Sequence, residues 1–137
     1  MRVVLEFDDV PASQNRQLRM HWRTRRQANE TLGLYLLSAA SDWAEENGVT
    51  APLFRKSGTA PPARIHVTMW RSKLQDPDNA VACLKGLIDK MVRMGALHDD
   101  TREWMERLDV EERVGPKKTR IQIDYQHGEE QVRRGEL

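Results

Sequence analysis

The sequence predicts an α/β (α+β) fold: one small domain with a mixed sheet of about four strands and two main helices, in the order β-α-β-α-β-β. The chain has 137 residues, which is the size of a single domain with its own core. Four segments alternate apolar and polar residues as half-buried strands do, and two longer segments repeat with the period of an amphipathic helix. Helices and strands that alternate in this way indicate helices packed on a sheet.

Composition limits the class of protein. The hydrophobic fraction is 39% and the charged fraction 31%, and no apolar run approaches the roughly 20 residues that a membrane span needs. The N-terminal residues lack the apolar segment of a signal peptide. Cys83 is the single cysteine, which excludes an intrachain disulfide and a cysteine zinc cluster. We therefore expect a cytoplasmic protein in a reducing compartment.

The first half of the chain is expected to contain a strand, a loop and a helix. Val3, Leu5 and Phe7 occupy alternate positions and predict a strand, whereas residues 8–24 show no period and are expected to form a loop. A helix is expected over residues 24–47, ending at the stop signal Asn-Gly. Its predicted buried face comprises Ala28, Leu32, Tyr35, Ala39 and Trp43. Leu34 and Leu37 lie off this face and either broaden the core or contact a partner subunit.

Three strands are expected in the second half. After a Pro- and Gly-containing loop over residues 48–62, a strand is predicted over 63–71, in which His66 is expected to be packed or hydrogen-bonded rather than a ligand. Residues 104–114 and 121–125 also alternate, and the turn at 115–118 joins them as a hairpin. Residues 127–137 are polar and are expected to be a disordered tail, so the folded domain is predicted to span 1–126.

Charge is unevenly distributed along the chain. Arginines crowd a short segment that also contains His21 and Trp22, while acids concentrate after Asp76. The segment contains Arg16, Arg19, Arg23, Arg25 and Arg26. A basic segment beside an acidic pocket suits a metal-dependent enzyme acting on a polyanion. A solvated arginine-rich loop is the alternative.

The stretch from Gln75 to Thr101 carries most of the candidate chemistry. Asp76 precedes Pro77, which is favoured at the first helical position, so Asp76 is expected to be a helix N-cap. Asp78 and Asn79 follow in the first turn, where negative charge suits the helix dipole. These residues alone are explained as an ordinary helix start. The rest of the stretch decides whether they also belong to a functional site.

Helical phase separates two sides of the predicted central helix. A core side is predicted to contain Val81, Leu84, Ile88 and Met91. Asp78, Lys85 and Asp89 lie along another edge, within about 40° of one another. Lys85 and Asp89 form either a surface ion pair four residues apart or an active-site edge whose lysine meets a phosphate. Gly95 then ends the helix, and Asp99 and Asp100 follow.

Carboxylates at both ends of one helix suggest a divalent-metal site. If the chain doubles back along the helix, Asp100 can approach Asp76 and Asp78. Three or four converging carboxylates bind Mg²⁺ or Mn²⁺, which prefer oxygen ligands. Such sites usually perform phosphoryl transfer, with Lys85 stabilising the transition state electrostatically. Together with the arginine segment, this predicts hydrolysis of a nucleic-acid phosphodiester.

These residues resemble the central motif of the RusA family of Holliday junction resolvases, which is Asp-x-Asp-Asn, a lysine, an aspartate four residues on, and Asp-Asp. The matching positions are Asp76-Pro77-Asp78-Asn79, Lys85, Asp89 and Asp99-Asp100. Pro11-Ala12-Ser13-Gln14-Asn15-Arg16 is similar to the family's Pro-Pro-Ser-x-Asn. The likeness covers residues 3–126. Five residues separate Asn79 from Lys85 where the family has two, which rotates the lysine by about 60° and shifts it by about 4.5 Å.

The resemblance implies a homodimeric, Mg²⁺-dependent endonuclease of bacteria and their phages, in which Mn²⁺ can replace Mg²⁺. Such an enzyme resolves four-way DNA junctions by paired symmetric nicks in recombination and repair. Asp76, Asp78 and Asp100 then correspond to the catalytic, metal-binding carboxylates and Lys85 to the catalytic lysine. Asn79, Asp89 and Asp99 correspond to supporting positions. The expected DNA-binding residues are Asn15, Arg16, Arg19, Arg23, Arg25 and Arg26.

Two other functions fit the same residues. The first is a non-catalytic module that binds branched DNA through its arginines, with acids that serve only as caps and structural charges. The second is a nuclease that acts on forks or flaps, because substrate choice depends on surface shape and dimer geometry, which the sequence leaves open.

Overall fold

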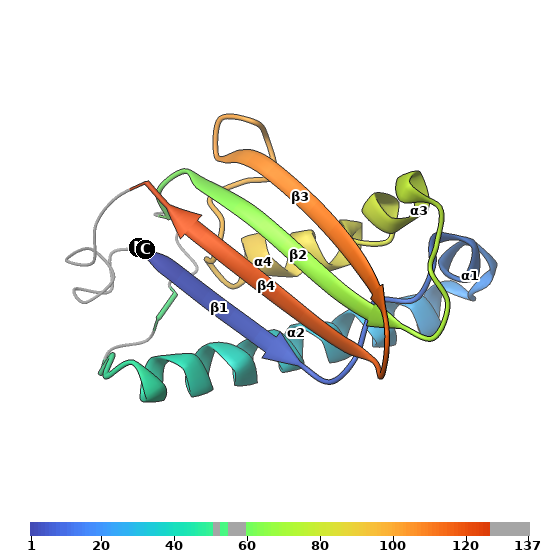
Figure 1. Cartoon of the computed structure of the whole chain (residues 1–137), viewed down its shortest axis with the longest axis horizontal. Helices are drawn as coiled ribbons and strands as arrows, with labels where there is room; N and C mark the ends of the chain where they lie inside the picture. Colours follow the sequence, from blue (N-terminus) through green and yellow to red (C-terminus); the bar gives the residue numbers. More distant parts are fainter. Residues whose placement is uncertain (51–52, 55–59, 127–137) are drawn as a thin grey trace.

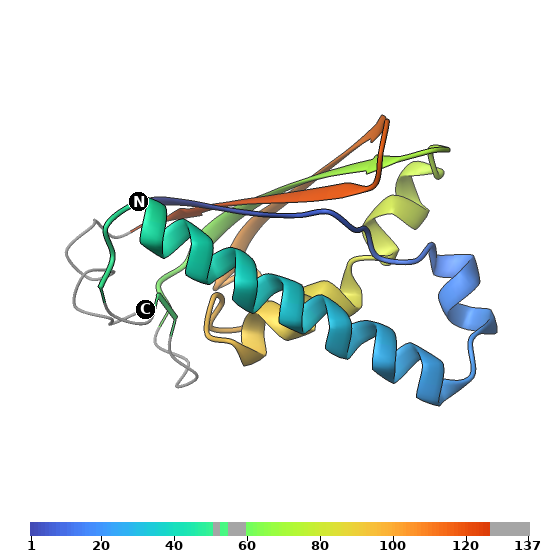
Figure 2. The same cartoon turned by 90° about the horizontal axis from the view of Figure 1, so that it is seen from below.

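A computed structural model describes residues 1–50, 53–54 and 60–126 of the chain. It consists of one four-stranded sheet with helices on one of its faces (Figures 1 and 2). This confirms the predicted fold class. The predicted tail, residues 127–137, and much of the loop predicted over residues 48–62 lie outside the described residues.

The sheet is mixed, with the strand order β1-β4-β2-β3. Its strands are β1 (Arg2–Phe7), β2 (Ala63–Arg71), β3 (Met105–Val114) and β4 (Lys118–Tyr125). β4 pairs antiparallel with both β1 and β2, whereas β2 and β3 run parallel (Figure 1). The four predicted strands are therefore confirmed, to within a few residues at their ends. The predicted hairpin of the last two strands is wrong: the turn after β3 leads directly to β4, but β2 lies between these two strands and pairs with both. β3 lies at an edge of the sheet, which explains why several of its residues are only partly buried.

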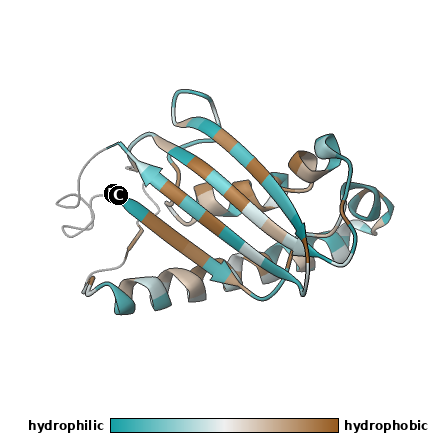
Figure 3. Ribbon diagram, in the orientation of Figure 1, coloured by the Kyte–Doolittle hydropathy of each residue, from teal (hydrophilic) through white to brown (hydrophobic). Residues whose placement is uncertain are grey.

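Alternation along the strands creates one apolar face. Hydrophobic and polar positions follow each other along β2 and β4 in Figure 3, whereas β1 carries a continuous hydrophobic stretch; successive side chains point to opposite sides of a sheet. The helices cover the apolar face, and the other face is open (Figure 2). Fully buried side chains include Val3, Leu5, Ile65, Met69, Ile121 and Ile123 from the sheet and Leu36, Leu84, Leu87, Met91 and Leu97 from the covering segments. None of the described helices is both long and apolar enough to cross a membrane.

The predicted loop over residues 8–24 is wrong in its second half. It contains helix α1 (Gln14–Arg19), and the long helix α2 (Trp22–Glu46) begins two residues earlier than expected. Local caps explain both starts, since Ser13 Oγ accepts a hydrogen bond from Arg16 N and His21 Nδ1 accepts one from Arg23 N. α1 buries none of its residues, so hydrophobic periodicity could not reveal it.

The buried face of α2 is rotated from the predicted one. Its buried residues are Leu32, Leu36, Ala39, Ala40 and Ala44, whereas Tyr35 is exposed. Leu34 and Leu37 are 67% and 55% exposed, so they do not broaden the core. Contact with a partner subunit stays a prediction for these two leucines.

The predicted central helix is two helices, α3 (Pro77–Ala82) and α4 (Lys85–Arg93), which meet at Cys83 and Leu84. At the break, Leu84 N donates to the carbonyl three residues back, and the Gln17 side chain donates to Cys83 O. Val81 was predicted to face the core but is 49% exposed. The predicted end at Gly95 is confirmed by its φ of +87°, a conformation that glycine adopts without steric cost.

α2 and α4 approach each other closely at Gly86. A Cβ atom at this position would lie 2.4 Å from Asn29 Oδ1, so the close contact depends on the absence of a side chain. Asn29 of α2 is thereby held against the first turn of α4, where Lys85 also lies.

Candidate functional site

Asp76 and Asp78 lie at the start of α3, as the sequence predicts. Asp76 occupies the N-cap position and Pro77 the first helical position, but the Asp76 side chain accepts no cap hydrogen bond. Both aspartates are exposed, and their carboxylates have no hydrogen-bond or ion-pair partner among the described residues. Capping by the Asp76 side chain therefore does not account for this residue, and both carboxylates are available to a ligand.

A cavity of about 600 Å³ lies among α1, α2, α3, α4 and the start of β3. Its polar wall is formed by Gln14, Gln17, Arg25, Asn29, Lys85, Asp89 and Asp100. An apolar wall that includes Val81, Ile88 and Leu108 completes it. One arginine of the basic segment thus shares a cavity with three charged residues of the acidic stretch.

The structure does not gather all the predicted metal ligands. Lys85, Asp89 and Asp100 line the cavity, but Asp76 and Asp78 do not. Over residues 1–50, 53–54 and 60–126, no three His, Cys, Asp or Glu side chains are placed to hold a metal ion together. Topology explains this separation: Asp76 follows the C-terminal end of β2, whereas Asp100 precedes the N-terminal end of the parallel strand β3.

Lys85 and Asp89 do not form a surface ion pair, which is one of the two arrangements that their spacing predicts. They lie four residues apart in α4, both are exposed, and neither has an ion-pair partner in the described part of the chain. Asp99 Oδ1 accepts a hydrogen bond from Asp100 N at 2.8 Å, so this carboxylate is engaged with the backbone of its own loop. The stacked rings of His98 and Trp104, whose centroids are 3.8 Å apart, flank the loop that carries both acids.

Asn79 lies in the first turn of α3 and is half-buried. Its carbonyl accepts a hydrogen bond from Cys83 N at 3.0 Å, within the backbone of that helix. Its predicted role as a supporting residue near Asp78 is compatible with this position.

The arginines predicted to bind DNA divide into two groups. Arg16 and Arg19 lie on α1 with Asn15, and all three are exposed. Arg23, Arg25 and Arg26 lie in the first turns of α2. Arg26 is paired with Glu30 at 3.3 Å, and the Arg23 guanidinium lies 5.2 Å from the centroid of the Trp22 ring.

Arg25 differs from its neighbours because it lines the cavity. Its Nε atom is buried and has no hydrogen-bond partner among the described residues. A buried donor without a partner is costly, and this sets Arg25 apart from the exposed arginines of the segment. Arg25 is therefore the arginine whose surroundings most favour a bound phosphate.

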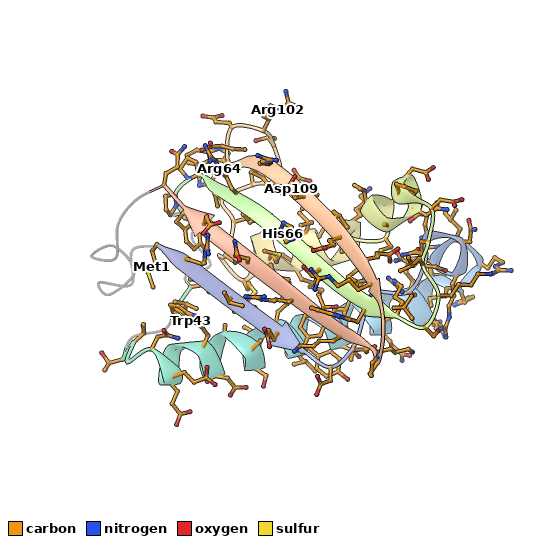
Figure 4. All side chains as sticks on the ribbon, in the orientation of Figure 1. Met1, Trp43, Arg64, His66, Arg102 and Asp109 are labelled. Carbon is orange, nitrogen blue, oxygen red and sulfur yellow. The ribbon has the colours of Figure 1, made fainter. Side chains whose placement is uncertain are left out.

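The open face of the sheet carries charged side chains of both signs, many of which are paired with each other. Figure 4 shows Arg64, His66 and Asp109 on this face. His66 Nε2 lies 3.5 Å from Glu111 Oε2, as expected for a hydrogen-bonded histidine. Further cross-strand pairs are Arg2–Asp124, Lys118–Glu6 and Arg120–Glu6. Basic and acidic groups alternate here, so this face lacks the uniform positive charge that favours a phosphate backbone.

Sequence reasoning missed a buried polar network beneath α3. Arg71 Nε and Glu112 Oε2 are 2.7 Å apart, and these side chains are only 11% and 7% exposed. Glu112 also accepts hydrogen bonds from Gln75 N and Gln75 Nε2. Arg71 Nη2 donates to Pro11 O and to Cys83 Sγ. Burial raises the pKa of the Cys83 thiol, which keeps it neutral in this network.

A sequence signal for this network exists. Leu108, Val110 and Glu112 occupy alternate positions of β3, opposite Ile65, Val67 and Met69 of β2. Glu112 thus stands where the alternation calls for an apolar residue, and Arg71 continues the same face of β2. Two opposite charges that interrupt the buried stripes of two predicted strands indicate a buried pair.

No family model matches this chain, and no curated protein sequence matches it either. Two features of its structure are candidates for function. The first is the cavity with Arg25, Lys85, Asp89 and Asp100 on its wall. The second is the pair of unpartnered carboxylates at the start of α3, Asp76 and Asp78, above the buried network.

Proposed function

We propose that this chain is a Mg²⁺-dependent endonuclease that resolves branched DNA, with four-way junctions as its preferred substrate. The observation that carries the proposal is the cavity in which Arg25, from the arginine segment, lies with Lys85, Asp89 and Asp100 from the acidic stretch. A nuclease needs a cation for the phosphate beside groups that manage the developing charge. The resemblance of the motif residues to the RusA family gives the substrate.

Arg25 and Lys85 supply the contacts to the scissile region of the DNA backbone. Neither cation has an ion-pair partner in the described residues, so neither has to break an ion pair to bind a phosphate. Arg25 offers a planar guanidinium with several donors, and Lys85 offers a point charge. Arg16, Arg19 and Arg23 extend the positive surface along α1 and the first turn of α2 and hold the flanking backbone.

The donor chemistry of the acids fits Mg²⁺, with Mn²⁺ as a substitute. Asp76, Asp78 and Asp100 would hold the ion, because free carboxylate oxygens are the ligands that these hard cations prefer. When bound, the ion supplies an activated water and charge stabilisation on the phosphate. Asp76 and Asp78 do not line the cavity with Asp100, so the proposal requires a movement of the chain that brings Asp100 to the turn of Asp76 and Asp78 when the ion binds.

Paired symmetric nicks require two active sites and therefore a homodimer. We place this activity in recombination and repair, in the cytoplasm of a bacterial cell. Leu34 and Leu37, exposed on α2, are available to a subunit contact. A nuclease with the same site that prefers forks or flaps is a variant of this proposal and is separated from it by substrate competition.

A non-catalytic module for branched DNA is the second candidate. The observation in its favour is that no three metal-ligating side chains meet within the described residues. In this case Arg25 and Lys85 bind the DNA backbone, no DNA is cleaved, and the aspartates serve only as structural charges.

The decisive experiment is cleavage of a synthetic four-way junction by the purified full-length chain with Mg²⁺, with Mn²⁺ and without either ion. We expect nicked duplexes only when a divalent ion is present. Asp78→Asn is expected to bind the junction without cutting it, because an amide removes the anionic ligand. Asp42→Asn is the matched control, since Asp42 is an exposed acid on α2 that lies outside the cavity wall.

Two results would reject the nuclease proposal. One is the absence of cleavage of every branched DNA tested with Mg²⁺ or Mn²⁺. The other is an equal loss of cleavage in Asp78→Asn and Asp42→Asn. Tight junction binding that is independent of metal, without cleavage, would instead support the binding module.

A further inference from the structure

The turn that carries Asp76 and Asp78 rests on a buried ion pair between β2 and β3. Arg71 is the last residue of β2, and Glu112 lies on the helix-covered side of β3. Their side chains are nearly inaccessible, and Arg71 Nε lies 2.7 Å from Glu112 Oε2. The pair is therefore shielded from water and salt.

Glu112 connects this pair directly to the turn. Its Oε1 accepts a hydrogen bond from Gln75 N at 2.9 Å, and its Oε2 accepts one from Gln75 Nε2 at 2.8 Å. Gln75 is the residue immediately before Asp76. One carboxylate thus fixes both the backbone and the side chain of the residue that leads into the acidic turn.

Arg71 fixes the segments on either side of the same turn. Its Nη2 donates to Pro11 O at 2.6 Å, which holds the approach to α1, and to Cys83 Sγ at 3.5 Å, at the end of α3. Cys83 Sγ in turn donates to Ala80 O at 3.2 Å. The residue that leads into α3 and the residue at its end are both tied to the ion pair.

The placement of the two aspartates depends on this support. Asp76 and Asp78 have no side-chain partners in the described chain, so only the backbone of the turn determines where their carboxylates lie. We propose that Glu112 is a positioning residue that, with Arg71 and Gln75, fixes this turn so that both carboxylates are presented together to a divalent cation. The inference rests on the proposed nuclease function for its consequence and on hydrogen bonds for its geometry.

Stability alone does not explain why a charged pair occupies this place. Apolar side chains of similar volume often stabilise a core as well as a buried ion pair does. The neighbouring positions of both strands, Met69 and Val110, are apolar. What the pair provides, and apolar residues would not, is an acceptor for the Gln75 amide.

The test compares three forms of the full-length chain: wild type, the double variant Arg71→Met/Glu112→Leu, and Thr119→Val. The double variant replaces the buried charges by apolar groups and removes the acceptor for Gln75. Thr119→Val is the matched control, because Thr119 is fully buried and its Oγ1 donates to Asp9 O at 2.6 Å, with no side-chain hydrogen bond to Arg71, Gln75 or Glu112. Gln75→Ala is added as a variant that leaves the ion pair intact.

The first readout is made without metal or DNA. Hydrogen exchange of the Gln75 amide and ¹⁵N relaxation of residues 76–79 report the order of the turn. In the double variant we expect the exchange protection factor of the Gln75 amide to fall by at least about tenfold and Asp78 to become more mobile. Loss of the contacts that support metal ligands has effects of this size in other sites. Thr119→Val should leave both unchanged.

The second readout is junction cleavage at saturating Mg²⁺. The double variant and Gln75→Ala should lose about 10- to 100-fold in kcat, while KM for DNA stays within about twofold because Arg25 and the arginine segment are untouched. A loss that is confined to KM, or one that is equal in Thr119→Val, would overturn the positioning role.

The two readouts separate the inference from the function on which it rests. If wild type does not cut the junction, the proposed function fails. A more mobile turn in the double variant would still show that Glu112 positions this turn. If the double variant folds and its turn stays as ordered as in wild type, and the same holds for Gln75→Ala, the inference fails whatever the cleavage assay shows.

Discussion

Removing one charge of the Arg71–Glu112 pair should destabilise this protein far more than removing both. The perturbations are Arg71→Met, Glu112→Leu and the two together. Each single substitution leaves a charge in a place where the two side chains are 11% and 7% exposed. The double substitution leaves none.

The expected magnitudes follow from this burial. An unpaired buried charge costs about 3–5 kcal/mol, and Glu112→Leu also leaves the two Gln75 donors without acceptors, at about 1–3 kcal/mol. For a domain of this size, about 3–5 kcal/mol lowers Tm by roughly 10–17 °C. The double variant leaves no buried charge but still leaves the Gln75 donors without acceptors, so it should be about 1–3 kcal/mol less stable than wild type, and the double-mutant cycle should show a coupling of several kcal/mol.

Urea denaturation followed by tryptophan fluorescence, with thermal unfolding as a second probe, measures these differences. The exposed pair Arg26–Glu30 is the control, since its side chains are 73% and 56% exposed and Arg26→Met should change the unfolding midpoint little. Additive single effects, or a double variant that is less stable than either single variant, would refute the reasoning.

Three further outcomes are expected. Tyr125→Phe should cost about 1–3 kcal/mol in urea unfolding, because the buried Tyr125 hydroxyl donates to Ala96 O at 2.6 Å and that carbonyl would lose its partner; an unchanged midpoint would show that water replaces it. The hydrogen bond from Arg2 lowers the pKa of Asp124. The stability that the Asp124 carboxylate contributes is therefore present above the unfolded-state pKa and is lost as pH falls through the folded-state pKa. The stability difference between wild type and Asp124→Asn should shrink below about pH 4, and a constant difference from pH 7 to pH 2 would contradict this. Arg25→Met should weaken junction binding and reduce its salt dependence by about one counterion, whereas Arg26→Met, which removes an arginine paired with Glu30, should have the smaller effect in gel-shift titrations; equal effects would argue against a phosphate in the cavity.

Strands and the long helix follow from sequence because their signals are local. Val3, Leu5 and Phe7 alternate because one side of β1 faces the core, and Ile65, Val67 and Met69 do the same in β2. Asn47-Gly48 ends α2 where the stop signal predicts. These features depend on neighbouring residues and on one buried face, so a single sequence specifies them.

Other features escaped prediction because they depend on contacts between distant residues. α1 buries no side chain and is held by its cap at Ser13, so it has no periodicity to detect. The break between α3 and α4 lies where Gln17 reaches Cys83 O, across 66 positions of sequence. A continuous helical pattern over the same residues could not show this.

The sequence by itself determined the fold class, the strand positions and the acidic and basic residues that suggest phosphodiester chemistry. Only the tertiary structure decided which of them meet: Arg25 with Lys85, Asp89 and Asp100 in one cavity, and Asp76 with Asp78 on a separate turn. The parallel pairing of β2 and β3 sets this division, since it places the end of one strand and the start of the next at opposite ends of the sheet. Local patterns specify which face of an element is buried, but the distance between elements depends on how the whole chain packs.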